Sequence, residues 1–410
     1  MMARAGAKCR RGAASAIVPE YGKGAMRADL DALLPALRAR RDETRENRTV
    51  LPEIREMIRD SGVARILQPP AYGGAGGPLR DAVHALSEIG AACGSTGWAV
   101  VQYVVHPYMV SHWPEQAQDE VWGDDPKALL AGILIQSLGR YQRVDGGYRV
   151  SGRWPFVTGV DTCDWCLVSA YEEGRAGEHE SHLHFLIRRD EIEVLDTWHA
   201  LGLRGSGTND VRLQEFFVPA HRALSMEALR GGESPGGRWR ETPLYLLPSY
   251  PIFGCGISSG AVGIALEMVA EYNEIARKKG SIMAEKGVAT FASQHIRFAE
   301  TKCAVDGALQ LLYSAADEVS AIVYEEGRLP NLEERARCRA LATHAGNMAM
   351  DAAREIWTLS GAASVYSRNS LGNLYTDMMV ASQHYTLNKD VNYTTYGRML
   401  YGLEIDNPTL

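Results

Sequence analysis

The chain has 410 residues, with 43 Lys or Arg against 50 Asp or Glu, which gives a formal net charge of −7. This length exceeds one ordinary core and, at about 150 residues per domain, predicts two or three packed units. The acidic balance offers no basic surface for nucleic acid or an anionic membrane, so a small molecule is the expected partner. Seven Cys, an odd number spread over a long chain, are typical of reduced thiols and predict a cytoplasmic protein.

The N-terminal segment carries basic residues as a signal peptide does, but its apolar stretch at residues 13–18 is too short for one. We expect residues 1–25 to form a disordered extension, with Met26 as an alternative start. The longest apolar run, residues 98–110, is interrupted by Gln102, His106 and Pro107. It predicts a buried helix rather than a membrane span.

Apolar residues recur at helical spacing over residues 30–37 and 54–58, and again over residues 83–89. The turn-rich segment 69–78 separates the second of these patterns from the third. Residues 26–125 are therefore predicted to form an N-terminal helical domain.

The apolar period then changes to two, the alternation that indicates β-strands. It does so over residues 148–156, 164–170, 182–187 and 211–218. Gly146-Gly147 and an acidic stretch before residue 182 supply turns between these runs. The pattern predicts a central β domain over residues 126–230.

Residues 231–243 contain four Gly and two Pro and have the composition of a linker. Long helical patterns follow at residues 257–276, 290–323 and 333–359. They predict a C-terminal helical bundle over residues 244–410. A helical domain, a β domain and a helical bundle in this order predict an α+β fold.

Simple catalytic signatures are missing from the sequence. Residues 254–260 have the wrong spacing for a dinucleotide fingerprint and open a helical run, in which Gly256, Gly260 and Gly263 would allow close approach to a neighbouring helix. There is no Walker A loop and no Gly-x-Ser-x-Gly elbow, so the sequence lacks the simplest signatures of nucleotide hydrolysis and of esterase chemistry.

Two short pairs have residue types that ligate metals. Cys163 and Cys166 form an isolated Cys-x-x-Cys without the second pair typical of zinc sites, so we interpret them as buried structural cysteines. His182 and His184 share one face of a predicted strand, but no further ligand cluster lies near them in the sequence. We expect a solvated strand face there, and no metal site.

A set of local patterns occurs in a fixed order along the chain. The N-terminal part contains Cys-Gly-Ser-Thr-Gly-Trp at residues 93–98, then His106 and Pro-Glu-Gln-Ala-Gln at residues 114–118. Further patterns occupy residues 147–154, 156–159, 164–165, 198, 202–208 and 217–219. Together they resemble the acyl-CoA dehydrogenase superfamily over residues 30–405, particularly its flavin monooxygenase branch, which includes the oxygenase component of p-hydroxyphenylacetate hydroxylase.

This resemblance implies an acyl-CoA dehydrogenase-like fold and a flavin-dependent monooxygenase, the oxygenase component of a two-component system. Such an enzyme takes reduced flavin, FMNH2 or FADH2, from a separate NAD(P)H:flavin reductase. It uses O2, through a C4a-hydroperoxyflavin, to hydroxylate an aromatic or amine small molecule. The resemblance also implies a homotetramer, because flavin contacts in the superfamily usually include a neighbouring subunit.

The same resemblance implies three catalytic residues. Thr158 would place its hydroxyl and backbone near flavin N5, where a hydrogen bond hinders loss of hydrogen peroxide. His384 lies at about the position where dehydrogenases carry a catalytic Glu, and it would set the protonation of the oxygen adduct. His106, eight residues after Trp98, would contact the substrate.

Cofactor-binding residues also follow from the resemblance. Trp98, Trp154 and Phe156 would wall the ring and keep water away. Arg277 would bind the flavin phosphate, and Ser360 with Gly361 would add a backbone turn, both from the neighbouring subunit.

The sequence departs from the family pattern in two places. Thr376 and Asn373 stand where relatives usually carry Arg, and residues 132–137 lack the usual Pro-x-Gly. The identity of the flavin tail and of the substrate therefore stays open. Two alternatives also remain: an FAD-dependent acyl-CoA dehydrogenase-like oxidoreductase, with Glu267 or Glu300 as a displaced base, and a helical scaffold without flavin. The missing Ile-Tyr-Glu-Gly-Thr stretch disfavours the dehydrogenase.

Overall fold

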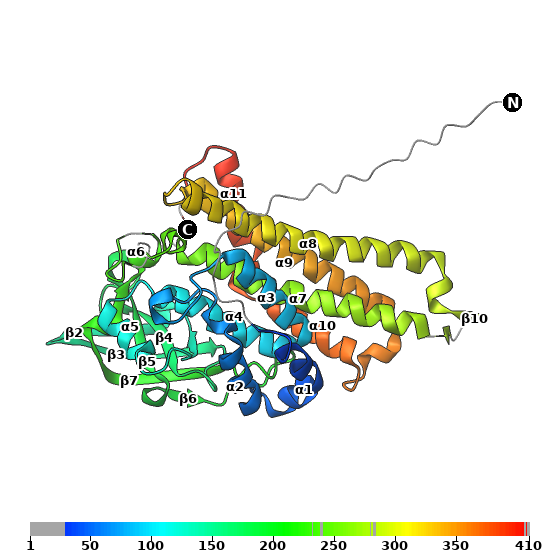
Figure 1. The fold of residues 1–410 in the computed structure, drawn as a ribbon, viewed down its shortest axis with the longest axis horizontal. Helices are drawn as coiled ribbons and strands as arrows, with labels where there is room; N and C mark the ends of the chain where they lie inside the picture. Colours follow the sequence, from blue (N-terminus) through cyan, green and yellow to red (C-terminus); the bar gives the residue numbers. More distant parts are fainter. Residues whose placement is uncertain are drawn as a thin grey trace.

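The computed structural model describes residues 29–405 and 407, except residues 232, 238–240, 279 and 282–283. The expected extension over residues 1–25 lies outside the described residues. Helices, then strands, then long helices follow one another along the chain (Figure 1), so the predicted α+β fold class is confirmed.

The N-terminal part is helical. Its helices are α1 (Leu33–Asn47), α2 (Pro52–Ser61), α3 (Leu79–Ala92), α4 (Gly94–Val110) and α5 (Glu115–Trp122). Pro52 stands in the first turn of α2, where its missing N–H has no intrahelical partner to lose, and Gly62 ends the helix at φ 78°. Every residue of α4 is buried, which confirms the predicted buried helix.

The β part is one mixed sheet with the strand order β6-β7-β3-β2-β4-β5-β8, and β1 pairs with β4 in parallel. The strands are β1 (Leu130–Gly132), β2 (Gly139–Val144), β3 (Gly147–Val157), β4 (Trp165–Glu172), β5 (His182–Arg188), β6 (Glu193–Leu195), β7 (Asn209–Pro219) and β8 (Ala223–Ser225). The four predicted strands correspond to β3, β4, β5 and β7. The short strands β1, β6 and β8 have too few residues to show a period.

The C-terminal part is dominated by three long helices that lie side by side in Figure 1: α7 (Ser249–Lys278), α8 (Ala292–Glu325) and α9 (Leu332–Ser360). A two-stranded ribbon, β9 (Gly280–Ser281) and β10 (Ala284–Gly287), follows α7. The remaining helices are α6 (Met226–Leu229), α10 (Ser370–Ala381) and α11 (Lys389–Leu400).

Helix α7 packs closely on α3 because glycines bring the two backbones together. A Cβ atom on Gly263 would lie 2.3 Å from the carbonyl oxygen of Ser87, and one on Gly90 would lie 2.9 Å from that of Gly260. Any side chain there would force the helices apart. The predicted close approach at Gly263 and Gly260 is confirmed.

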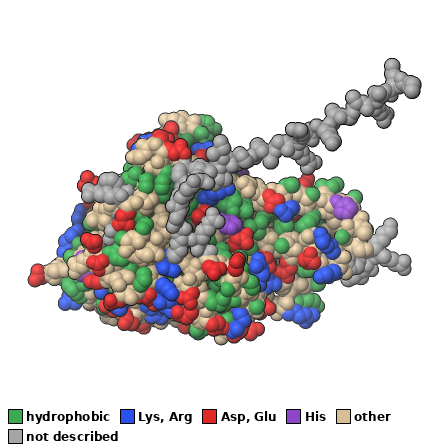
Figure 2. All heavy atoms as spheres, in the orientation of Figure 1, with side chains coloured by type: hydrophobic (Ala, Val, Ile, Leu, Met, Phe, Trp, Pro, Cys, Tyr) green, Lys and Arg blue, Asp and Glu red, His purple; other side chains and the backbone are tan. Residues whose placement is uncertain are grey.

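Among the described helices, α7 alone is long and apolar enough to cross a membrane by length and composition. However, 83% of its apolar window is buried inside the fold. Packing against α3, α4, α8 and α9 accounts for this apolar sequence. The face drawn in Figure 2 carries acidic and basic side chains interspersed rather than a field of one sign.

Candidate active site

Helix α4 carries or contacts several of the predicted site residues. It carries Trp98, Tyr103 and His106, all buried. Tyr103 donates its hydroxyl to the carbonyl of Gly159 at 2.9 Å, which ties α4 to the turn that contains Thr158. Trp98 meets His384 edge to face, with ring centroids 5.7 Å apart. One helix therefore contacts both the β part and the C-terminal part of the site.

His106 presents a bare nitrogen to its surroundings. Its Nδ1 lies 2.9 Å from the carbonyl oxygen of Gln102, and because a carbonyl only accepts, Nδ1 carries the proton. Nε2 is left as an acceptor, and it is buried without a partner among the described residues. Burial lowers the pKa of His106 to about 4, so the ring is neutral at pH 7.

His384 shows the opposite arrangement. Its Nδ1 accepts the backbone N–H of Thr386 at 3.2 Å, as the N-cap of the short turn Tyr385–Leu387. An Nδ1 that accepts leaves the proton on Nε2, so this ring presents a donor. The side chain is half-buried, and burial lowers its pKa to about 4.

Phe253 on α7 connects the two histidines. Its ring centroid lies 6.2 Å from that of His106 and 5.7 Å from that of His384. Trp98, Phe253 and the two imidazoles thus form a continuous aromatic cluster between α4, α7 and the segment after α10. The sequence analysis missed Phe253, because one Phe in a long apolar helix carries no signal beyond core packing.

Thr158 lies in the turn that follows β3. It is buried, and its hydroxyl oxygen accepts the hydroxyl of Thr208 at 3.1 Å. Thr208 in turn shares a hydrogen bond of 2.7 Å with Ser206. When Ser206 donates to Thr208 and Thr208 donates to Thr158, the hydrogen of Thr158 remains for another acceptor. The structure therefore presents a directed hydroxyl donor at this turn.

The strand that leads into this turn is irregular. The pairing of β3 with β7 shifts register between Trp154 and Val157, and Phe156 has a φ of 66° in this bulge. A bulky residue in that region is strained, and such strain gathers at functional sites. Phe156 is 59% exposed and meets Trp198 in a T-shaped contact, with ring centroids 6.4 Å apart. An exposed aromatic ring here could lie against a ligand.

Trp154 occupies a different position from the other predicted aromatic residues. It is fully buried and donates its indole N–H to the carbonyl of Ser169 at 2.9 Å. A Cβ atom on Gly139 or Gly152 would collide with its ring. Trp154 lies in the core and supports the strand that leads into the turn of Thr158.

The loop of residues 202–208 links Thr158 to two other parts of the fold. The N–H of Gly205 donates to the hydroxyl of Ser95 at the start of α4, at 3.2 Å. The N–H of Leu203 donates to the carboxylate of Asp377 on α10, at 2.6 Å. Burial raises the pKa of Asp377 to about 6, although Arg45 and this N–H act in the opposite direction.

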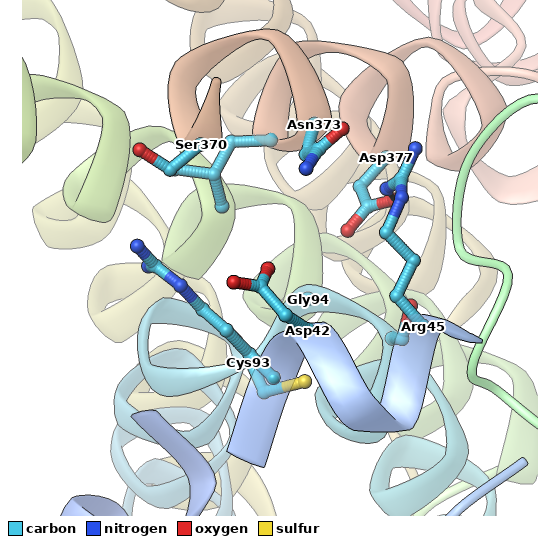
Figure 3. A pocket seen from close by; sticks show the side chains of 10 residues that line it. Asp42, Arg45, Cys93, Gly94, Ser370, Asn373 and Asp377 are labelled. Atoms are coloured by element: carbon cyan, nitrogen blue, oxygen red, sulfur yellow. Dashed lines mark hydrogen bonds and ion pairs between the residues drawn. The ribbon is translucent and has the colours of Figure 1, made fainter. Parts of the chain in front are cut away.

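A small cavity lies beside Asp377, where the sequence departs from the family pattern (Figure 3). Arg45 from α1 points at Asp377 and lies 3.3 Å from both its carboxylate and the hydroxyl of Thr376. In relatives the residue before this Asp is usually Arg, and here it is Thr376. Arg45 from another helix thus places a guanidinium beside Asp377. The cavity volume is about 30 Å³, enough for water but far too small for a flavin ring.

The residues expected from a neighbouring subunit lie away from the turn that carries Thr158. Arg277 is at the end of α7, next to the β10 end of the molecule, whereas the sheet lies at the opposite end (Figure 1). Its side chain is 67% exposed and lies 4.0 Å from Glu274. Ser360 is buried at the end of α9 and bonds the carbonyl of Ile356, while Gly361 ends the helix at φ 71°.

The expectation of a solvated face for His182 and His184 is wrong. Both side chains are buried, and six of the seven residues of β5 are buried, so this strand has no solvated face. Among the described residues there is no group of three His, Cys, Asp or Glu side chains that could hold a metal. Cys163 and Cys166 are buried free thiols, as predicted, and burial raises the pKa of Cys163 to about 12.

The two glutamates considered as displaced bases do not join the cluster. Glu267 lies 3.3 Å from Arg41 and 3.9 Å from Arg38, in an ion-pair group between α7 and α1. Glu300 is exposed on α8. The described geometry therefore gives no support to the dehydrogenase alternative.

Comparison with known proteins decides the family. The acyl-CoA dehydrogenase N-terminal domain model matches residues 26–124, and the C-terminal domain model matches residues 255–389. The oxygenase subunit HsaA of Rhodococcus jostii RHA1, a flavin-dependent monooxygenase, is 32% identical over 92% of this chain and 98% of its own. The chain belongs to the flavin-dependent monooxygenases of the acyl-CoA dehydrogenase fold.

Two further similarities bear on the expectations. The oxygenase component of p-hydroxyphenylacetate 3-hydroxylase from Acinetobacter baumannii is 26% identical over 96% of this chain and 92% of its own. XiaF from Streptomyces sp., solved with FADH2 and glycerol, matches with a TM-score of 0.85 and 27% identity over 93% and 96% of the chains. The predicted family, enzyme class and reduced-flavin cofactor are confirmed, and a family of oxygenase components implies a separate flavin reductase.

The residues around Thr158 fit a flavin. Thr158 keeps a hydroxyl hydrogen beyond its hydrogen bond with Thr208, and Phe156 keeps an exposed ring, so each can contact a further partner. A planar ring with polar edges provides such partners.

Proposed function

We propose that this chain is an oxygenase that hydroxylates an aromatic or amine small molecule bound between His106 and His384. The observation that carries the proposal is the opposite hydrogen-bonding state of these histidines across Phe253. One ring offers a bare acceptor and the other a donor, and both are neutral at pH 7. Bound reduced flavin supplies the electrons and activates the dioxygen from which one oxygen atom reaches the substrate.

His106 orients and activates the substrate. Its bare Nε2 accepts the hydrogen of a phenol or amine, which raises the electron density of the ring to be hydroxylated. The hydrogen bond from Nδ1 to Gln102 fixes both the tautomer and the ring orientation. The low pKa keeps the nitrogen free to accept throughout the neutral range.

His384 holds a proton opposite that acceptor. Its Nε2–H can donate to the activated oxygen that reacts with the substrate. The hydrogen bond from the backbone N–H of Thr386 to Nδ1 holds the ring in this orientation. Trp98 and Phe253 pack on this ring and exclude water from it.

The flavin would be held by both the β part and a second subunit. Thr158 would donate its hydroxyl hydrogen to the ring, Phe156 and Trp98 would pack on the ring, and Trp154 would support the strand beneath. Arg277, Ser360 and Gly361 of a neighbouring protomer would hold the phosphate, in a homotetramer. We place this enzyme in the cytoplasm, where a flavin reductase supplies it.

The test combines the purified chain with a separate NADH:flavin reductase, FAD or FMN, and phenolic or aniline substrates under ¹⁸O2. Product carrying one ¹⁸O atom is expected only when the reductase is present. The chain alone is expected not to oxidise NADH, because it contains no dinucleotide fingerprint. Rapid NADH oxidation by the chain alone, or no labelled product from any substrate with reduced flavin, would contradict the proposal.

A further inference from the structure

Three side chains on the sheet have buried polar atoms that the proposed mechanism does not use. They are Ser169 on β4 and His182 and His184 on β5. The hydroxyl of Ser169, both ring nitrogens of His184 and Nε2 of His182 have no hydrogen-bond partner among the described residues. A buried polar group without a partner is costly, so groups of this kind are retained where a ligand or water satisfies them.

These side chains lie on one face of the sheet. Ser169 and His184 are directly paired across β4 and β5, and the rings of His182 and His184 lie 4.6 Å apart. Residues two apart on a strand share a face, so Leu167 lies on the same face as Ser169. The polar atoms are therefore adjacent to one another rather than scattered.

The same face leads to the substrate nitrogen of His106. A Cβ atom on Gly132 would lie 2.8 Å from Nε2 of His106 and 2.9 Å from Cβ of Leu167, so His106 lies against β1 at the residue that pairs with Leu167 of β4. Ser169 is the next residue on this face, about 7 Å further along the strand. His106 also lies close enough to His184 to contribute to the lowering of its pKa. One aromatic ring with two hydroxyl groups spans a separation of about 7 Å.

The chemistry of the three side chains selects the group that they bind. Burial lowers the pKa of His182 to about 4 and lowers that of His184 well below its ordinary value, so both imidazoles are neutral at pH 7. Each then has one N–H and one bare nitrogen, and Ser169 adds a hydroxyl. Such a set suits a neutral group that both donates and accepts hydrogen bonds, as a hydroxyl does. It does not suit a carboxylate, because the three side chains include no cation.

We propose that Ser169, His182 and His184 form a polar recess that binds a second, neutral hydroxyl of the aromatic substrate, while His106 binds the first. The inference rests on the proposed function, because it takes the aromatic substrate to lie at His106. It narrows the substrate class to rings with two hydrogen-bonding hydroxyl groups.

The test is anaerobic calorimetry on the full chain saturated with reduced FAD, with phenol, catechol, resorcinol and hydroquinone as probes. One or two additional hydrogen bonds predict that at least one dihydroxybenzene binds about three- to thirty-fold more tightly than phenol. His184→Phe should abolish this preference and leave phenol affinity unchanged. Thermal stability should stay equal or rise, because the variant removes two buried nitrogens that lack partners.

Two variants keep the test informative. Ser169→Ala adds no volume and should reduce the preference even if His184→Phe does not fold. His112→Phe is the matched control: His112 is also buried, just after the end of α4, and its Nε2 has no partner among the described residues, but its Nδ1 is bonded to Ser234 at 3.2 Å, so this variant should lose that hydrogen bond and keep the preference.

The outcomes separate the two proposals. Phenol binding without any preference for a dihydroxybenzene, or a preference that survives both His184→Phe and Ser169→Ala, overturns the recess and leaves the proposed function standing. Failure to bind any of the four probes, together with failure to form labelled product, overturns both.

Discussion

At the residue scale, the backbone sets what each histidine of the site can do. His106 Nδ1 faces a carbonyl and His384 Nδ1 faces an N–H, so two chemically identical side chains become an acceptor and a donor. The sequence indicates both positions but not these states, because neither Gln102 nor Thr386 differs from an ordinary helix or turn residue. Tautomers follow from backbone geometry, which only the fold supplies.

Replacement of the two histidines is expected to separate substrate binding from oxygen use. His106→Phe removes one acceptor, so substrate should bind about three- to ten-fold more weakly while reduced flavin is still reoxidised. His384→Phe should leave substrate affinity near that of the parent and change the rate, or the pH dependence, of reoxidation. Anaerobic titration and stopped-flow absorbance measure the two effects. Identical defects in both variants would refute the division of roles.

Replacement of Thr158 is expected to waste oxygen rather than to stop its use. Thr158→Ala removes a hydrogen-bond donor worth about 1–2 kcal/mol, so the ratio of hydrogen peroxide to product should rise about five- to thirty-fold. Flavin reoxidation should continue. Thr158→Ser keeps the hydroxyl and should stay close to the parent. An unchanged ratio in folded Thr158→Ala protein would remove this residue from the site.

At the element scale, long regular segments could be predicted from the sequence, whereas the contacts that build the site could not. The strands β3, β4, β5 and β7 follow alternating patterns, and helix α4 contains a long apolar run. The error at His182 and His184 has a physical cause. Alternation of apolar and polar residues predicts a solvent-exposed face only where one face of the sheet is open to solvent, whereas β4 and β5 are buried on both faces. Phe253 joins the cluster through tertiary packing alone.

The burial of Asp377 beside the loop of residues 202–208 is expected to make stability depend on pH. The pKa of this carboxyl is about 6 in the fold against 3.8 as its ordinary value, so the folded state binds more protons between these pH values. The contribution of Asp377 to stability therefore falls as pH rises from 4 to 6, by about 3 kcal/mol in total. Asp377→Asn has no such loss.

Thermal unfolding of Asp377→Asn and the parent between pH 4 and 7 measures this effect. The stability of the variant relative to the parent should rise through this window and level off above pH 6. Asp42→Asn removes an exposed carboxyl of the same cavity and serves as the control. A difference between Asp377→Asn and the parent that is constant with pH would show that burial of this carboxyl is not the cause.

At the scale of the whole molecule, the predicted flavin contacts lie far apart in one chain, which favours the proposed oligomer. Helix α7 has 30 residues and is about 45 Å long, and Arg277 lies at its end away from the sheet. Val365 and Tyr366, which follow Gly361, are 68% and 55% exposed, as apolar residues at a subunit contact would be in an isolated chain. These positions favour a site completed by a second protomer.

Subunit sharing is expected to appear as complementation between two defective variants. Arg277→Glu replaces the proposed phosphate-binding cation and should weaken reduced-flavin binding about ten- to one-hundred-fold, while static light scattering should give the same mass as for the parent, that of the proposed tetramer. Thr158→Ala lowers product per oxygen consumed, as argued above.

If Thr158 and Arg277 of one site come from different chains, random co-assembly of the two variants regenerates about a quarter of the sites intact. At limiting flavin, these mixed oligomers should form more product per oxygen consumed than either variant alone or the two mixed after separate assembly. Equal coupling in all four samples, or a monomer that turns over at the full rate, would place the whole site in one chain.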